Sequence, residues 1–147
     1  MQFRHILVPI DFSESANVGL DYALLLARQF EAKVTLLHVV ELPTYVYATD
    51  ILIPIDEIQR AAAKCIKKAA ARAREVWPNV EPLLAEGTVW EQILSVASYP
   101  SVELVVMGTH GRRGISRALL GSVAEKVVRL SPVPVLTVRP REPKKDD

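Results

Sequence analysis

Four short, nearly continuous apolar runs divide the chain and limit the folds open to it. They cover residues 5–10, 34–40, 102–107 and 133–138, and each is rich in Val, Ile and Leu. A half-exposed antiparallel strand alternates apolar and polar residues, whereas a continuous run indicates a strand covered on both faces, as in parallel sheets. A weaker run at residues 80–85, interrupted by Pro82, predicts a fifth strand at a sheet edge.

Segments with helical spacing separate these runs. Apolar residues recur every three or four positions in residues 13–30 and 57–77. The second segment contains Cys65, which is predicted to be a small buried side chain. Capping-box patterns predict helix starts at Thr88 and Ser122, and a looser relative of the pattern predicts one at Asp56.

The order of elements is βαβαβαβαβ, with no run of strands alone. This order predicts an α/β fold, a doubly wound five-stranded parallel sheet with helices on both faces. A chain of 147 residues is about the size of one domain, so we expect a single domain over residues 1–140 and a charged tail over 141–147. The connection from Glu41 to Pro54 is long and apolar. We interpret it as a flap packed over the domain edge or as a lid for a ligand or partner.

Charge and cysteine content restrict the partners and the compartment. With 18 Lys and Arg against 17 Asp and Glu, the net charge of +1 provides no chain-wide field for nucleic acid or anionic membranes. The single cysteine cannot form an internal disulfide, and no apolar stretch approaches the ~20 residues of a membrane span or the form of a signal peptide. A cytoplasmic location is therefore expected. A basic stripe on one helical face is interpreted as a solvated face rather than a nucleic-acid contact, because no aromatic platform accompanies it; it comprises Arg60, Lys64, Lys67, Lys68 and Arg72.

Candidate ligand-binding residues follow the first and fourth runs. In a doubly wound sheet, ligands bind at the carboxyl ends of the strands where the winding reverses. Asp11 and Ser13 follow the first run. The segment from Met107 to Ser122 follows the fourth and contains four of the six glycines, which predict positive φ or close approach of the backbone. With a helix expected to open at Ser122, free backbone N–H groups and nearby cations predict a phosphate site; the cations are Arg112, Arg113 and Arg117.

The spacing Gly108-x2-Gly111-x9-Gly121-Ser122 resembles the nucleotide loop of the ATP-binding branch of the universal stress protein family. The first strand, ending in Ile-Leu-Val-Pro-Ile-Asp11 with a serine two residues on, is also similar to that family. So are the second strand's end, Leu37-His-Val-Val40, and the final strand. The resemblance covers almost the whole chain and implies a Rossmann-like fold of the adenine nucleotide alpha hydrolase type.

The resemblance also implies a set of ATP-binding residues. Pro9, Asp11 and Ser13 would border the base and phosphates, and Asp11 would hold a Mg²⁺ that bridges the phosphates. Backbone groups of Val39 or Val40 would face the adenine. The remaining implied neighbours are Met107 and Gly108 along the ribose, Gly111 and Gly121 with backbone amides at the phosphates, Ser122 and Val123 closing the site, and Ile10, His110, Arg112, Arg113 and Gly114 around them.

Several of these residues have structural alternatives. Ser122 could cap its own helix through the Ser-x-x-Glu125 pattern, alone or together with a phosphate contact. Asp11 could accept only N–H groups at the mouth of the first helix. His110 is interpreted as an exposed loop residue that reaches a ligand or stands beside it, and His38 and His5 as satisfied core histidines.

Three functions are consistent with the sequence. The first is an ATP-binding regulator of a stress response, the second a slow ATP hydrolase using Asp11 or a metal-bound water, and the third an interaction module that binds no nucleotide. The phosphate loop of standard NTPases, the dinucleotide fingerprint, Cys/His metal spacing and the nucleophile elbow do not occur in the sequence. The strand from Val133 to Val138 is predicted to end the sheet and to pair with its copy in a homodimer, as members of the family commonly do.

Overall fold

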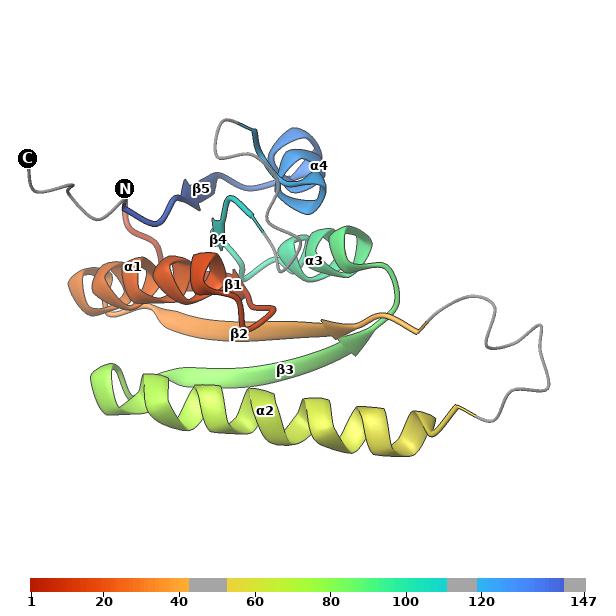
Figure 1. Cartoon of the computed structure of the whole chain (residues 1–147). Helices are drawn as coiled ribbons and strands as arrows, with labels where there is room; N and C mark the ends of the chain where they lie inside the picture. Colours follow the sequence, from red (N-terminus) through yellow and green to blue (C-terminus); the bar gives the residue numbers. More distant parts are fainter. Residues whose placement is uncertain (43–52, 111–118, 142–147) are drawn as a thin grey trace, which may run out of the picture.

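The computed structural model describes residues 1–42, 53–110 and 119–141. Within these ranges the chain forms one sheet of five parallel strands in the order β3-β2-β1-β4-β5, together with four helices (Figure 1). The elements are β1 (His5–Pro9), α1 (Glu14–Phe30), β2 (Lys33–Val40), α2 (Ile55–Val76), β3 (Val80–Glu86), α3 (Val89–Ala97), β4 (Leu104–Gly108), α4 (Ser122–Leu130) and β5 (Val135–Val138). The predicted doubly wound α/β fold is confirmed.

The winding of the sheet reverses at its central strand. From β1 the chain moves outward to β2 and β3, then crosses back to place β4 on the other side of β1 and β5 beyond it. The register aligns Pro9 of β1 with Leu37 of β2, and Gly108 of β4 with Val138 of β5. Because all five strands are parallel, their carboxyl ends share one edge, and the reversal lies between β1 and β4.

Both faces of the central strands β1, β2 and β4 are buried, which explains their continuous apolar runs, whereas the edge strand β5 is only partly buried. Ile6 and Val8 point toward the layer formed by α1 and α2, whereas Leu7 points toward α3 and α4. These three side chains are completely buried, so the central strand has no polar face. Strand β3 lies at the edge, as predicted from Pro82, which stands opposite Leu36 of β2.

All the predicted helices form, and α3 and α4 begin at or next to the predicted residues, but the predicted capping-box hydrogen bonds do not form. Helix α4 begins at Ser122 with Gly121 as its N-cap, so the Ser122 hydroxyl is one residue too far into the helix to cap it, and Glu125 instead forms an ion pair with Arg129. Thr88 is the N-cap of α3 but makes no side-chain cap. Likewise α2 starts at Ile55, so the looser Asp56 pattern lies inside the helix, and its Gln59 donates to Glu86 at 2.7 Å.

Cys65 is exposed, so the prediction that it is buried is wrong. The buried residues of α2 are Ile66, Ala70 and Ala73, a narrow stripe facing the β2 and β3 side of the sheet. A helix at the margin of a sheet covers less of the sheet than a central helix does. The buried stripe of α2 is therefore narrower than the apolar face expected from the sequence. None of the described helices combines the length and apolarity needed to cross a membrane. Most of the predicted flap, residues 43–52, lies outside the described residues.

Candidate functional site

The turn after β1 holds Asp11 in a defined position. The Asp11 carboxylate accepts a hydrogen bond from the Ser13 backbone N–H at 3.0 Å, and the Ser13 hydroxyl accepts one from the N–H of Ala16 at 3.2 Å, capping α1. Between them Phe12 adopts φ 64°, a left-handed conformation that is rare for an aromatic residue. Asp11 therefore accepts a backbone N–H at the mouth of the helix, as one of its predicted roles requires, and its ATP-binding role stays a prediction.

The end of β4 packs directly on the first turns of α1. A Cβ atom at Gly108 would lie 2.4 Å from the Ser15 hydroxyl oxygen and 2.6 Å from the Ser15 backbone carbon and oxygen. The Ser15 hydroxyl is buried and accepts a hydrogen bond from the backbone N–H of His110 at 3.3 Å. The close approach predicted for this glycine is therefore confirmed, and its partner is protein backbone.

The amino terminus of α4 is tied to the end of β4. The Gly121 N–H donates to the Thr109 carbonyl at 2.7 Å, and the Thr109 N–H donates to the carbonyl of Val138 at 3.1 Å. Gly121 has φ −59°, so the positive φ predicted as one option for these glycines does not occur here. Ser122 and Val123 lie in the first turn, where helical N–H groups have no intrahelical acceptor. The amino end of α4 thus lies beside the carboxyl ends of β4 and β5.

Residues 111–118 lie outside the described residues. The ATP-binding roles of Gly111, Arg112, Arg113 and Gly114 therefore stay predictions.

The end of β2 presents alternating backbone groups. The Leu37 carbonyl accepts from the Ile10 N–H at 2.8 Å, so Val39, two residues on, turns its backbone toward the same side, beyond the end of β1. The Val40 carbonyl instead accepts from Gly87 at 3.0 Å, on the β3 side. Of the two residues proposed to face a base, Val39 is therefore directed toward the reversal point and Val40 away from it.

Sequence reasoning did not foresee the contacts that join these loops. His38 Nδ1 lies 2.8 Å from the Ile10 carbonyl, and its ring packs against Phe12 with the ring centroids 4.7 Å apart. His38 is thus satisfied, as predicted, but it also braces the turn that carries Asp11. The His110 ring lies 2.9 Å from the Thr109 hydroxyl. The only signal for Ser15 was a small residue on the inner face of α1.

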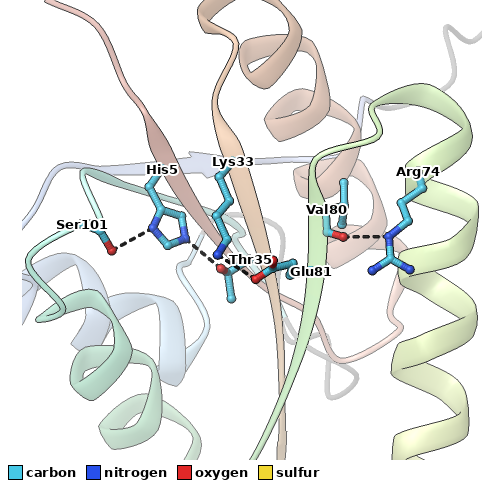
Figure 2. A network of polar contacts seen from close by, with 7 residues as sticks. All are labelled: His5, Lys33, Thr35, Arg74, Val80, Glu81 and Ser101. Atoms are coloured by element: carbon cyan, nitrogen blue, oxygen red, sulfur yellow. Dashed lines mark hydrogen bonds and ion pairs between the residues drawn. The ribbon is translucent and has the colours of Figure 1, made fainter.

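A second polar cluster lies at the opposite edge of the sheet, where the strands begin. Figure 2 shows His5 between Ser101 and Thr35, at 3.1 Å and 2.7 Å from their hydroxyl oxygens, with the Lys33–Glu81 ion pair beside it at 2.7 Å. Burial and then the charge of Lys33 hold the pKa of His5 below its ordinary value of 6.5, against smaller opposing effects of Glu81 and Glu103. His5 is a satisfied histidine, as predicted, and it lies far from Asp11.

The described residues contain no group of three His, Cys, Asp or Glu side chains able to hold a metal ion. A cation at this edge would therefore need oxygen atoms from a bound molecule, such as a phosphate, in addition to the Asp11 carboxylate. This fits Mg²⁺, which commonly binds through one or two carboxylates and the phosphates of a nucleotide.

Fold and edge geometry together define a doubly wound α/β protein with a candidate ligand site at its topological switch point. The chain belongs to the universal stress protein family, whose sequence model matches residues 2–139. It is 33% identical to universal stress protein YxiE of Bacillus subtilis over 147 residues, which covers 93% of this chain and 99% of the relative.

Solved structures agree with this fold. Universal stress protein UspA from Lactobacillus plantarum superposes with a TM-score of 0.78 at 23% identity, covering 95% of this chain and 99% of that one. A universal stress protein solved in complex with cAMP has a TM-score of 0.68 at 25% identity, covering 95% of this chain and 98% of that one.

Proposed function

We propose that the chain binds ATP with Mg²⁺ at the edge formed by the carboxyl ends of β1 and β4, and that it acts as a nucleotide-dependent regulator of a stress response. The observation that carries this proposal is that the Asp11 turn follows β1 and the amino terminus of α4 is bonded to the end of β4, the two strands between which the winding reverses. One brings a carboxylate and the other a row of N–H donors. Nucleotides bind doubly wound sheets at this point.

The amino end of α4 suits a phosphate group. Gly121 has no side chain with which to cap the first turn, and the helix dipole adds partial positive charge there. The N–H groups of Ser122 and Val123 would donate to phosphate oxygens, and the Ser122 hydroxyl, which does not cap the helix, would add a further contact. Asp11 would hold Mg²⁺ between the phosphates while one of its oxygens keeps the bond to Ser13.

The adenine would lie toward β2, against the Val39 backbone, with Pro9 and Ile10 beneath it and Met107 and Gly108 along the ribose. A relative that covers nearly this whole chain was solved with cAMP, which supports an adenine nucleotide as the ligand class. Binding in this form requires no catalytic base, so the proposal concerns a binding protein rather than an efficient hydrolase.

Calorimetric titration of nucleotide-free protein with Mg-ATP tests the proposal. Gly121→Val should weaken binding about tenfold or more, because its side chain would stand where the backbone must approach a phosphate. The backbone at Gly121 is ordinary for any residue, so the variant should fold. Thr88→Val is the matched control, since it places valine at the N-cap of α3, which also has no side-chain cap. Absence of saturable binding at millimolar Mg-ATP, or equal loss in both variants, would refute the site.

We also propose that the protein is a homodimer joined through β5. This strand ends the sheet, and apolar side chains are exposed on it and on the neighbouring helix α4. An unpaired apolar edge favours pairing with a second copy. The exposed side chains are Val128, Leu130 and Leu136.

A further inference from the structure

A groove of about 410 Å³ runs between α1 and α2, on the outer side of the helical layer. Its floor is formed by apolar side chains that are less than a tenth exposed, among them Ile10, Leu24 and Ala73. Lys68 and Arg72 line its α2 wall, and Asp21 lines the α1 wall. The groove therefore has a recessed apolar floor, and its α2 wall carries positive charge.

The cationic wall belongs to a longer band of positive charge. Between Gln59 and Glu75, helix α2 carries six basic residues and no acidic one, although the whole chain has a net charge of only +1. All six are exposed, and neither Lys68 nor Arg72 forms an ion pair with another described residue. The basic residues are Arg60, Lys64, Lys67, Lys68, Arg72 and Arg74.

We propose that this groove is the docking site for an acidic amphipathic helix of a partner protein. Lys64, Lys68 and Arg72 follow one another at intervals of four residues, so successive charges lie about 6 Å apart along α2. A second helix laid along the groove presents carboxylates at the same interval while its apolar stripe faces the floor. The spacing and the sign of the charges on α2 therefore match those of an acidic helix laid along the groove.

Other polyanions fit this surface less well. Duplex nucleic acid and lipid headgroups would meet the cations, but neither supplies apolar side chains to fill a floor recessed between two helices. A small amphiphilic anion would fill part of the groove and leave Lys64, one turn before Lys68 and outside the lining residues, without a partner. Only a helical segment uses both the floor and the length of the band.

The groove ends at the turn that carries Asp11. Phe12 lines the groove, and its left-handed backbone lies between Asp11 and Ser13, whose hydrogen bond forms the turn of the proposed nucleotide site. Strained backbone of this kind is common in switch segments. A nucleotide and a docked helix would thus act on the same three-residue turn, and their affinities would be coupled reciprocally. This coupling rests on the proposed function, whereas the docking itself does not.

A display library of helix-forming peptides of about 18 residues, long enough to span the groove, tests the docking on nucleotide-free protein. Selection against the wild type with counter-selection on the K68E/R72E double variant should enrich amphipathic peptides with acidic residues four apart. Lys68→Glu should then weaken a selected peptide about tenfold. Lys67→Glu makes the same charge change at the neighbouring exposed residue, which does not line the groove, and should weaken it less than about twofold.

Cys65 provides an independent reporter, because it is the chain's single cysteine and lines the groove. A docked peptide should slow its alkylation by a maleimide. Failure to enrich acidic amphipathic sequences, equal losses in the two lysine variants, or unchanged alkylation at saturating peptide would each overturn the docking. So would duplex DNA or anionic vesicles that bind more tightly than the selected peptides and depend equally on Lys68.

The coupling is measured by repeating the peptide titration with saturating Mg-ATP, after calorimetry has established whether ATP binds. A change in peptide affinity of about threefold or more is expected, within the usual range of coupling energies. Equal affinities with ATP bound would refute the coupling and leave the docking intact. Absence of ATP binding would refute both the proposed function and the coupling, while the peptide selection would still decide the docking.

Discussion

Replacing Gly108 by alanine should destabilise the protein at the contact between β4 and α1. The added Cβ would lie 2.4–2.6 Å from Ser15 atoms, whereas ordinary van der Waals contacts begin near 3.4 Å. Two of the three obstructing atoms are backbone, so no side-chain rotation relieves the clash. The first turn of α1 would have to move by the better part of an ångström, weakening the Ser15–His110 hydrogen bond and the packing of Ala16.

Forcing extra volume into a well-packed interior costs about 1–3 kcal/mol, and the rigid obstacle places Gly108→Ala near the upper end of this range. A loss of about 3 kcal/mol corresponds to a decrease in Tm of about 6–12 °C for a domain of this size. Urea unfolding followed by circular dichroism measures the change, with the slope m expected to stay constant.

Gly19→Ala is the matched control on the other side of the same contact. Its Cβ would lie 3.0 Å from the Gly108 nitrogen and 3.2 Å from the Met107 carbonyl carbon, a milder conflict. Alanine also favours the helix by about 1 kcal/mol relative to glycine. The free energy of unfolding should therefore change by less than about 1 kcal/mol. Finding Gly108→Ala as stable as the wild type, or Gly19→Ala the more damaging of the two, would refute this account of the packing.

Three further outcomes are expected. Because folding lowers the pKa of His5, the unfolded protein binds a proton at His5 at a higher pH than the folded protein does. The free energy of unfolding of the wild type should therefore fall as the pH drops below about 6.5 and level off below the lowered pKa. Urea titrations across this range should show a shallower fall for His5→Gln. Ile66→Ala, at a side chain that is 2% exposed, should cost about 2–5 kcal/mol in the same assay, and a loss under about 1 kcal/mol would mean that α2 is not packed as described. Leu136→Asp on the exposed edge strand should convert the proposed dimer to a monomer in sedimentation equilibrium, whereas a monomeric wild type would contradict the dimer.

The three central strands were predictable because their interiors are buried on both faces of the sheet. Alternate residues of β1 enter two different cores, so the sequence has to be apolar at successive positions. The edge position of β3 followed from Pro82, whose missing N–H is tolerated where one side of the strand has no neighbour. These signals are local, and they do not depend on the paths of the connecting loops.

The way α3 and α4 are capped and the burial of Cys65 were not predictable because they depend on tertiary contacts. A Ser-x-x-Glu pattern does not show which residue is the N-cap. At α4 the N-cap is Gly121, whose N–H donates to the Thr109 carbonyl outside the helix. Helical periodicity likewise places Cys65 near the apolar stripe of α2 without showing how narrow that stripe is. Ser15 and His38, which brace the candidate site, had no distinctive spacing and are found only from the packing.

The candidate site is built largely from backbone groups, and this decides which substitutions are informative. The N–H row of α4, the Val39 backbone and the turn at Asp11 would all persist after most side-chain truncations. Except at Asp11, whose carboxylate would hold the cation, deletion to alanine is therefore a weak probe of binding here, and added volume is a strong one. The two motif glycines within the described residues are not equivalent for this purpose. A side chain added at Gly108 would clash with Ser15 in the first turn of α1, whereas Gly121 has an ordinary backbone and faces the proposed phosphate. A loss of ATP binding in Gly121→Val with unchanged stability would thus report on the ligand, and the same loss in Gly108→Ala would report mainly on the scaffold.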